Sequence, residues 1–171
     1  NLIAPKGIFH IIFMQEKTIA VVGLGYVGLP LALLAERKGY TVLGIDIDTK
    51  KIETLEGGVS PFLDEEVARQ LKEAKRIQFS SDFSLISKAE IVVICVPTPV
   101  YENHMPNLEP VIGSSEGIAK YLTKGQLIIL ESTVNPGVSE TVVLPILEKV
   151  SGLKAGVDFS LAHCPERIFP G

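Results

Sequence analysis

The chain has 171 residues, of which 46% are hydrophobic and 21% are charged, enough for one domain with a core. Its formal net charge of -4 and the lack of any lysine-rich run argue against a nucleic-acid partner. The longest apolar stretch, residues 21–35, contains three glycines and a proline and is shorter than the roughly 18 residues of a membrane helix. We therefore expect one globular domain without a membrane partner.

Residues 1–13 precede Met14, which stands directly before the first expected strand. They contain a short apolar run after a lysine, but no small-residue cleavage site of a signal peptide follows it. We expect residues 1–13 to be a leader or an artificial N-terminal extension, and residues 14–171 to form the domain.

Short aliphatic runs alternate with helical patterns along almost the whole chain. Runs bounded by turn residues predict buried strands over residues 17–22, 41–45, 91–96 and 127–130, with weaker candidates at 77–79 and 159–162. Apolar residues at helical spacing predict helices over residues 27–38, 65–74, 109–122 and 139–150. Because parallel strands need long crossover connections, this order predicts a doubly wound α/β fold, with a parallel sheet between two helical layers.

The first strand runs into a glycine-rich turn, GLGYVG at residues 23–28, and a helix rich in Leu and Ala follows. In a GxGxxG turn the first glycine permits the tight bend, the second admits a pyrophosphate to the backbone, and the third lets helix and strand pack closely. The N-terminus of the helix offers N–H groups and a partial positive charge to an anion. Alone the motif is a weak signal, because glycine-rich turns also form for conformational reasons.

The residue that ends the second strand strengthens this interpretation. Asp46 follows Gly28 by 18 residues, where a carboxylate can accept hydrogen bonds from both hydroxyls of an adenosine ribose. A phosphate on that ribose would lie against Asp46, so the sequence favours NAD over NADP. Lys50 and Lys51 could receive such a phosphate, although a solvated first helical turn explains them as well. We expect a dinucleotide site in a Rossmann-type fold, with NAD as the cofactor.

Two later strands end in polar turns at the same carboxyl edge of the sheet. The stretch at residues 96–99 reads VPTP, and the stretch at 131–137 reads ESTVNPG. Hydroxyls there can bond a nicotinamide ribose or hold a water near the reacting carbon, but Ser132, Thr133 and Asn135 also suit turn and cap chemistry. Residues 98–109 form the longest irregular stretch and follow a strand end, where open α/β sheets bind ligands.

The two cysteines, Cys95 and Cys164, are far apart and have no CxxC neighbour and no histidine at zinc-ligand spacing. We therefore expect no metal site. Cys95 lies in an aliphatic run, which predicts a buried and unreactive thiol. The low cysteine content suits a reducing cytoplasm.

Six features in chain order together resemble the nucleotide-sugar 6-dehydrogenase family. They are GLGYVGLP at 23–30, Asp46, CVPTP at 95–99, ESTVNPG at 131–137, SGLKAGVDF at 151–159 and CPERIFPG at 164–171. Pro-Glu-Arg in the last stretch resembles the UDP-N-acetylhexosamine branch. Cys164 before it and Pro170-Gly171 after it are most similar to the UDP-N-acetyl-mannosamine enzymes, with UDP-N-acetylglucosamine or UDP-glucose as alternative substrates.

The resemblance implies oxidation of the sugar C6 alcohol to a carboxylate with two NAD+. In such enzymes a cysteine holds the aldehyde as a thiohemiacetal, and water then releases the acid. The resemblance puts that cysteine, a catalytic lysine, the dimer-forming central helix and the UDP-binding domain beyond residue 171. We therefore expect this chain to bind NAD without turnover, and we do not expect Cys164 to be the nucleophile.

Cofactor residues follow from the resemblance by position. Tyr26 and Val27 would lie along the NAD pyrophosphate, Asp46 on the adenosine ribose with Lys51 beside it, and Thr98 on the nicotinamide half. The full set of implied cofactor residues is Gly23, Gly25, Tyr26, Val27, Gly28, Asp46, Lys51, Pro97, Thr98 and Thr133. Two departures concern this site: Lys51 stands where an arginine is common, and Asn-Leu-Glu at 107–109 replaces the more usual Asp-Leu-Ser.

Catalytic and substrate residues are implied in the same way. Thr133 and Glu166 would position a water, with Glu166 as general base or orienting acid. Arg167 and Ile168 would begin the UDP-sugar site. Without the resemblance, Glu166 has the pattern of an exposed loop carboxylate and Arg167 that of a surface ion pair.

Two other functions stay open at this point. The chain could be a stand-alone NAD-binding or redox-sensing module without chemistry of its own. It could also be another hydride-transfer enzyme, such as a 6-phosphogluconate-type dehydrogenase, although the ESTV and CPER stretches argue against that.

Overall fold

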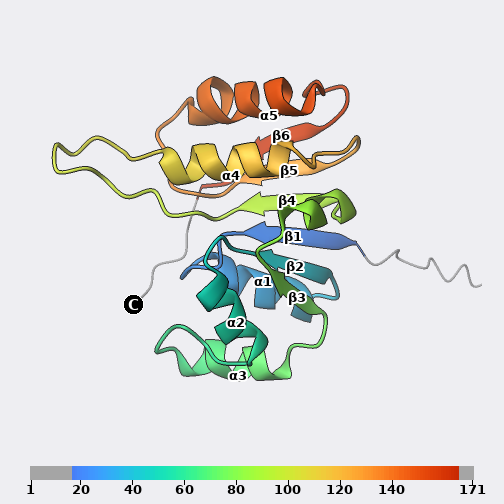
Figure 1. The fold of residues 1–171 in the computed structure, drawn as a ribbon, viewed down its shortest axis with the longest axis vertical. Coiled ribbons are helices and arrows are strands. Elements are labelled where there is room, and N and C mark those ends of the chain that lie inside the picture. The colour runs from blue at the N-terminus through green and yellow to red at the C-terminus, as the bar shows by residue number, and fades with distance from the viewer. Residues whose placement is uncertain (1–16, 166–171) are drawn as a thin grey trace, which may run out of the picture.

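The computed structural model describes residues 17–165, which contain one parallel sheet with the strand order β3-β2-β1-β4-β5-β6 (Figure 1). Its strands are β1 (Thr18–Val22), β2 (Thr41–Ile45), β3 (Ile77–Ser80), β4 (Ile91–Ile94), β5 (Leu127–Leu130) and β6 (Ser160–His163). The helices are α1 (Gly28–Arg37), α2 (Thr49–Glu56), α3 (Glu65–Glu73), the 3-10 helix η1 (Phe83–Lys88), α4 (Glu109–Ala119), the π-helical turn η2 (Ser139–Val143) and α5 (Leu144–Ser151). The doubly wound α/β fold predicted from the sequence is confirmed.

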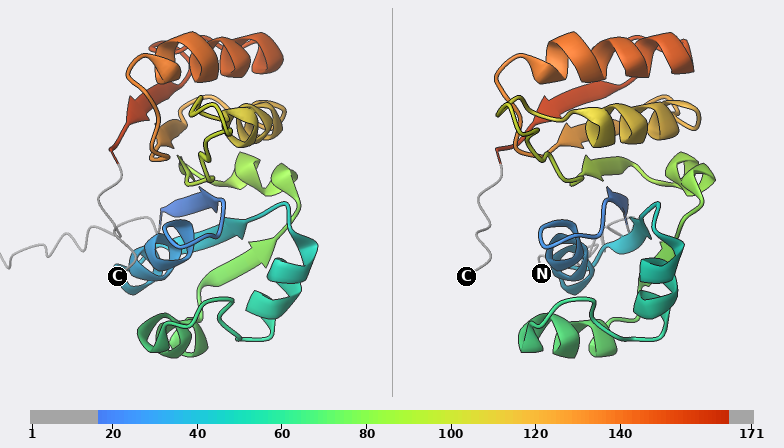
Figure 2. Two further views of the ribbon diagram at one scale, coloured as in Figure 1. Left: turned by 90° about the vertical axis from the view of Figure 1, so that its left-hand side faces the viewer. Right: turned by 60° about the vertical axis from the view of Figure 1, so that its left-hand side comes forward.

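The central strands β1, β2 and β4 are buried on both faces of the sheet, because successive residues of a strand point to opposite sides and helices cover each side, whereas the edge strand β6 is largely exposed. In β1, Ala20 and Val22 enter one apolar core and Val21 enters the other. Helices η1, α4 and α5 supply the first core, and α1, α2 and α3 supply the second. Figure 2 shows α4 beside α5 on one side of the sheet and α1 with α3 on the other. This two-sided burial accounts for the uninterrupted aliphatic runs in the sequence.

The connection from β3 to β4 contains only the short η1, which the sequence patterns do not predict. Asp82 caps it by accepting a hydrogen bond from the Ser84 amide at 2.8 Å. From the far side of the connection, the buried Gln126 amide donates to the carbonyls of Ile86 and Ala89 at 2.7 and 2.6 Å. Its carbonyl accepts from the Thr123 amide at 2.7 Å. One buried side chain thus pairs three backbone groups and joins η1 to the segment that precedes β5.

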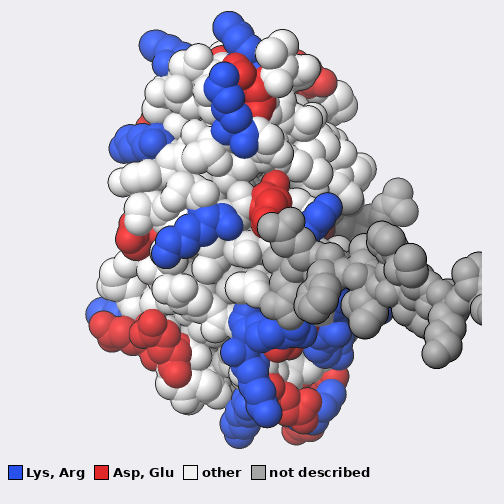
Figure 3. Space-filling view, turned by 90° about the vertical axis from the view of Figure 1, so that its right-hand side faces the viewer, with Lys and Arg blue, Asp and Glu red and all other residues white. Residues whose placement is uncertain are grey.

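Charged side chains lie in separate groups on the side of the molecule at which the strands begin, between larger uncharged areas (Figure 3). In Figure 3, Lys and Arg gather in the lower part of this side, with Asp and Glu among them. Some of these charges join elements, as where Arg76 donates to the Glu36 carbonyl at 3.0 Å. No helix within residues 17–165 is long and apolar enough to cross a membrane.

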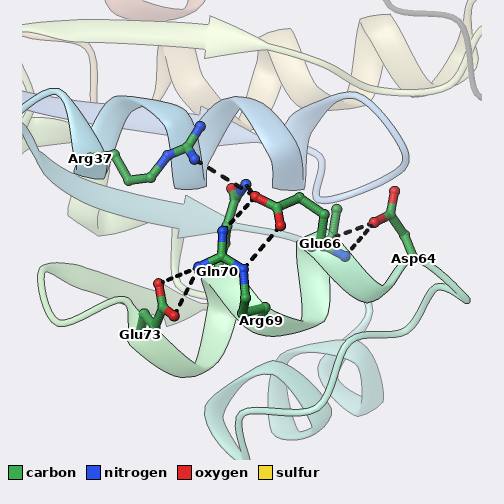
Figure 4. A network of polar contacts seen from close by, with 7 residues as sticks. Arg37, Asp64, Glu66, Arg69, Gln70 and Glu73 are labelled. Atoms are coloured by element: carbon green, nitrogen blue, oxygen red, sulfur yellow. Dashed lines mark hydrogen bonds and ion pairs between the residues drawn. The ribbon is translucent and has the colours of Figure 1, made fainter.

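A second group of charges lies along α3 and reaches α1 (Figure 4). Arg69 donates to both oxygens of Glu66, at 3.0 and 2.7 Å, and to Glu73 at 2.9 Å. Arg37 of α1 lies 4.0 Å from the Glu66 carboxylate. Hydrogen bonds from Arg69 and then from Gln70 lower the pKa of Glu66 from its ordinary value of 4.5 to about 2. The network stabilises the ionised form of Glu66.

Candidate functional site

A cavity of about 870 Å³ opens at the carboxyl edge of the sheet, between the glycine turn and α4. This volume lies within the range of about 300–1,000 Å³ that ligand sites occupy. The predicted cofactor residues that line it are Gly23, Gly25, Tyr26, Val27, Asp46, Lys51, Pro97, Thr98 and Thr133. The structure therefore brings together residues from four separate stretches of the chain at the edge where parallel α/β sheets bind ligands.

The three glycines of the turn differ in what surrounds them. A Cβ atom on Gly28 would lie 1.8 Å from the Gly23 carbonyl oxygen, and one on Gly23 would lie 2.7 Å from the Cys95 carbonyl oxygen. A Cβ on Gly25 would meet nothing within 4 Å, and Gly25 lines the cavity. The outer glycines thus allow close backbone packing, whereas the middle one leaves room for a ligand to approach the backbone.

Helix α1 begins at this turn with an N-cap residue that provides no side-chain cap. The N-cap residue, Val27, makes no side-chain hydrogen bond to the first turn, and that turn holds no acidic residue. The partial positive charge at the helix N-terminus is therefore not balanced by a carboxylate of the helix itself. Beside an open cavity, such a terminus suits a phosphate group.

The Asp46 carboxylate is buried at the end of β2 and is held by three donors. Its Oδ2 accepts from the Leu24 amide at 2.8 Å and from Lys51 Nζ at 2.7 Å, and its Oδ1 accepts from the Asp48 amide at 3.0 Å. The interpretation of Lys51 as a solvated residue of the first helical turn is therefore wrong, because the first turn of α2 brings residue 51 back over the strand end. Lys50 is exposed, as that interpretation expects. Within residues 17–165, Oδ1 accepts from the Asp48 amide alone, so it keeps capacity for a hydroxyl group.

The ends of β4 and β5 are joined beneath the cavity by Ser132. Its buried hydroxyl donates to the Val96 carbonyl at 2.8 Å, so Ser132 has the turn role that the sequence left open. The neighbouring Thr133 and, on the β4 side, Thr98 line the cavity. Within residues 17–165, neither of these two hydroxyls has a hydrogen-bond partner. Asn135 is exposed and does not line the cavity.

Cys95 is buried, as the sequence predicts, and its side chain lies against the glycine turn. A Cβ on Gly28 would be 3.1 Å from the Cys95 Cβ. The Cys95 thiol donates to Glu131 Oε2 at 3.4 Å. Cys164 is exposed, and within residues 17–165 neither cysteine forms a disulfide. Among residues 17–165, no three His, Cys, Asp or Glu side chains gather as a metal site would require.

Several lining residues come from elements that the sequence motifs do not mark. Gly113 and Gly117, one turn apart on α4, line the cavity together with Phe83 of η1, whose ring lies against Gly117. Ile47, directly after Asp46, also lines the cavity and is 83% exposed. The four-residue spacing of the two glycines on one helical face is a signal that could have indicated this wall.

The irregular stretch at residues 98–109 folds into an arm that projects beyond the sheet (Figure 1). Val100 and Pro106 form an antiparallel bridge, and the Asn107 amide donates to the Pro99 carbonyl at 2.7 Å. At the tip, His104 has a positive φ of 62°. The arm leads from the strand end at Ile94 to the start of α4, so it borders the cavity. Glu166, Arg167 and Ile168 lie outside the described residues.

Known proteins resemble the chain over almost its whole length. Residues 17–171 match the model of the UDP-glucose/GDP-mannose dehydrogenase family, NAD binding domain. A UDP-N-acetyl-D-glucosamine 6-dehydrogenase from Pseudomonas aeruginosa is 44% identical over 158 residues, which are 92% of this chain and 37% of that protein. A UDP-N-acetyl-D-mannosamine dehydrogenase from Pyrococcus horikoshii is 36% identical over 156 residues, 90% of this chain and 37% of that protein.

Solved structures agree with these matches. The UDP-D-ManNAc dehydrogenase from Pyrococcus horikoshii superposes with a TM-score of 0.85 at 36% identity, covering 90% of this chain and 37% of that one. The GDP-mannose dehydrogenase from Pseudomonas aeruginosa, solved as a ternary complex, has a TM-score of 0.85 at 30% identity, covering 88% and 36%. The chain thus spans a little over a third of the length of these relatives. It belongs to the UDP-glucose/GDP-mannose dehydrogenase family, and residues 17–171 correspond to the domain that binds NAD.

Proposed function

We propose that the chain is the cofactor domain of a UDP-N-acetyl-D-mannosamine 6-dehydrogenase, which oxidises the C6 alcohol of the UDP-sugar to the uronic acid with two NAD+. The observation that carries the proposal is the buried Asp46 beside the open Gly25, on one wall of a cavity that also receives Thr98 and Thr133. The sequence from Cys164 to Gly171 favours N-acetylmannosamine as the sugar. UDP-N-acetylglucosamine is the second candidate, and the 44% identity to the Pseudomonas enzyme supports it. UDP-glucose is the third.

The residues of the cavity fit NAD. The uncapped N-terminus of α1 and the bare backbone at Gly25 suit a pyrophosphate, and Tyr26 and Val27 would flank it. Asp46 would accept from the adenosine ribose through Oδ1. A 2'-phosphate would meet that carboxylate, and Lys51 is already paired with it, so NADP is disfavoured. When bound, NAD supplies the hydride acceptor.

Thr98, Thr133 and Pro97 would line the nicotinamide end. Both threonine hydroxyls lack a partner within residues 17–165, so both are available to a ligand or to a water. Such hydroxyls can orient a cofactor ribose or hold the attacking water without a change of charge.

Glu166 would act with Thr133 on that water, as general base or orienting acid. The register of the sheet supports this pairing, because Leu130 of β5 lies opposite His163 of β6. Thr133 and Glu166 each follow their strand residue by three positions in the sequence, and the parallel strands β5 and β6 end at the same edge of the sheet. Arg167 and Ile168, next along the chain, would begin the UDP-sugar site.

The remaining parts of the proposal concern the longer protein. The nucleophilic cysteine, the UDP-binding domain and a central helix that forms a homodimer would lie in the region that the relatives have beyond this domain. The low cysteine content of the chain suits a reducing cytoplasm, where we place the enzyme.

One pair of measurements tests the proposal. NADH should bind the 171-residue chain and gain fluorescence, NADPH should bind at least roughly ten-fold more weakly, and UDP-sugar with NAD+ should give no turnover. A full-length protein should release two NADH per UDP-N-acetylmannosamine, with UDP-N-acetylglucosamine and UDP-glucose compared under the same conditions. Turnover by the 171-residue chain alone would contradict the proposal that the nucleophilic cysteine and the UDP-binding domain lie outside it. NAD binding without sugar oxidation by the full-length protein would favour a stand-alone NAD-binding or redox-sensing module.

A further inference from the structure

The loop between α2 and α3, residues 57–64, reaches the cofactor cavity through one aromatic contact. The ring of Phe62 stacks on the ring of Tyr26, with centroids 4.2 Å apart and planes inclined by 27°. Tyr26 belongs to the glycine turn, lines the cavity and is 61% exposed. Stacking at this spacing favours one orientation of the two rings. Phe62 therefore restrains a side chain that solvent alone would leave free to change rotamer.

Phe62 is itself held by its own loop. The Ser60 hydroxyl accepts from the Phe62 amide at 3.1 Å and donates to the Phe62 carbonyl at 3.0 Å. Two residues later, Asp64 caps α3 by accepting from the amides of Glu66 and Val67 at 2.9 and 3.0 Å. The backbone on both sides of Phe62 is thus fixed, so its ring presents a fixed surface to Tyr26.

Helix α3 in turn is fixed against α1, the helix that starts at the glycine turn. Val67 and Leu71 of α3 are buried in the same core as Leu33 of α1. Near the other end of α1, Arg37 points toward Glu66 of α3 (Figure 4). The α2–α3 segment therefore contacts α1 near its C-terminus through Arg37 and reaches the turn before its N-terminus through Tyr26.

We propose that Phe62 is a positioning residue for cofactor binding, which holds Tyr26 at the mouth of the cavity and makes the α2–α3 loop part of the NAD site. The inference rests on the proposed function in one respect, that Tyr26 contacts NAD. If Tyr26 were free to rotate, NAD binding would have to order its ring, and the entropy lost in that step would weaken the affinity for NAD. Held by Phe62, the ring is already oriented when the cofactor arrives.

A double-mutant cycle on NADH affinity tests this, with the 171-residue chain and NADH fluorescence as the readout. Phe62→Ala should weaken NADH binding roughly two- to twelve-fold, the range that an aromatic pair is worth. In the background of Tyr26→Ala, the same change should leave NADH affinity unaltered. Phe62→Tyr should restore binding, because it keeps a stacking ring, and Phe62→Leu should not. Leu63→Ala is the matched control, since Leu63 lies in the same loop and is fully exposed.

Three outcomes would overturn the inference. Equal weakening by Phe62→Ala with and without Tyr26 would show that Phe62 acts on the fold and not through Tyr26. Restoration of affinity by Phe62→Leu would show that apolar volume alone matters. Failure of the unaltered chain to bind NADH would overturn the proposed cofactor site and this inference with it, whereas binding without coupling would overturn this inference alone.

Discussion

The two halves of the cavity differ in how firmly the chain itself holds them. On the β1–β2 side, Asp46 has three hydrogen-bond donors, and Gly23 and Gly28 allow tight backbone contacts. On the β4–β5 side, Ser132 holds the strand ends together, but the hydroxyls of Thr98 and Thr133 make no hydrogen bond within residues 17–165. The difference indicates that the half proposed to bind the adenosine part is prearranged. The half proposed for chemistry keeps its polar groups free for ligand, water or chain outside the described residues.

The largest effect that this comparison predicts comes from the glycine turn. In Gly28→Ala, the new Cβ would lie 1.8 Å from the Gly23 carbonyl oxygen, so helix and turn must move apart. We expect the free energy of unfolding to fall by about 3 kcal/mol, the upper end of what overpacking costs. NADH binding should fall with it. Urea unfolding followed by circular dichroism, and NADH titration, measure the two effects.

Gly25→Ala is the matched control for that change. A Cβ there meets nothing within 4 Å, so stability should change by no more than about 0.5 kcal/mol. The methyl group would still stand where a pyrophosphate should approach, and NADH affinity should fall by roughly ten-fold or more. If both variants lost stability equally, the distinction between packing glycines and the ligand-facing glycine would be wrong.

Replacing Asp46 should have the next largest effect, on cofactor choice as well as stability. Asp46→Asn removes the charge that pairs with the partly buried Lys51, and we expect a loss of about 1–3 kcal/mol. NADH should bind more weakly, and the ratio of NADPH to NADH dissociation constants should shrink because Lys51 is released. Asp158→Ala is the control, because it removes the hydrogen bond from the Lys154 amide, at a cost of about 1 kcal/mol, in a loop that does not line the cavity. An unchanged ratio in Asp46→Asn would argue against its role in cofactor choice.

Two adjacent residues should give opposite phenotypes on the other side of the cavity. Ser132→Ala removes the hydrogen bond to the Val96 carbonyl and should cost about 1 kcal/mol of stability. Thr133→Ala should leave stability nearly unchanged but lower the rate of NADH production by a full-length protein. Thermal unfolding and steady-state kinetics on the same two variants check this. A destabilised Thr133→Ala would mean that its hydroxyl serves the fold after all.

The smallest effect concerns the exposed network on α3 and depends on pH. Because the pKa of Glu66 is about 2 in the fold and 4.5 ordinarily, its ion pairs stabilise the fold above pH 4.5. That contribution is lost as the pH falls through about 2, where the folded state also binds the proton. The unfolding temperature of Arg69→Met should therefore lie below that of the unaltered chain at pH 6 and approach it near pH 2. A difference that persists in acid would point to lost packing of the Arg69 stem.

Much of the fold and half of the site could be predicted from local sequence. The strands are aliphatic runs because both faces are buried, and the glycine turn and Asp46 belong to one β-α-β unit whose parts lie close together in the chain. By contrast, η1 depends on Gln126 far along the chain, and no local pattern reveals it. Only tertiary packing brings Gly113 to the cavity wall and Phe62 against Tyr26. From the residue pattern, Lys51 could face solvent or a phosphate. Its pairing with Asp46 depends on how the first turn of α2 follows β2, which only the structure shows.

The side chain of Gln126 also has a consequence for the order of folding. Its amide meets the carbonyls of Ile86 and Ala89, which lie 40 and 37 positions earlier in the chain. Until the start of β5 arrives, the crossover lacks both of these hydrogen bonds, and the only one of the two carbonyls that η1 pairs by itself is that of Ile86, which accepts from the Ala89 amide at 3.1 Å. Contacts between residues so distant in sequence form slowly. A nascent chain would therefore complete the packing of η1 only after residue 126 had been made.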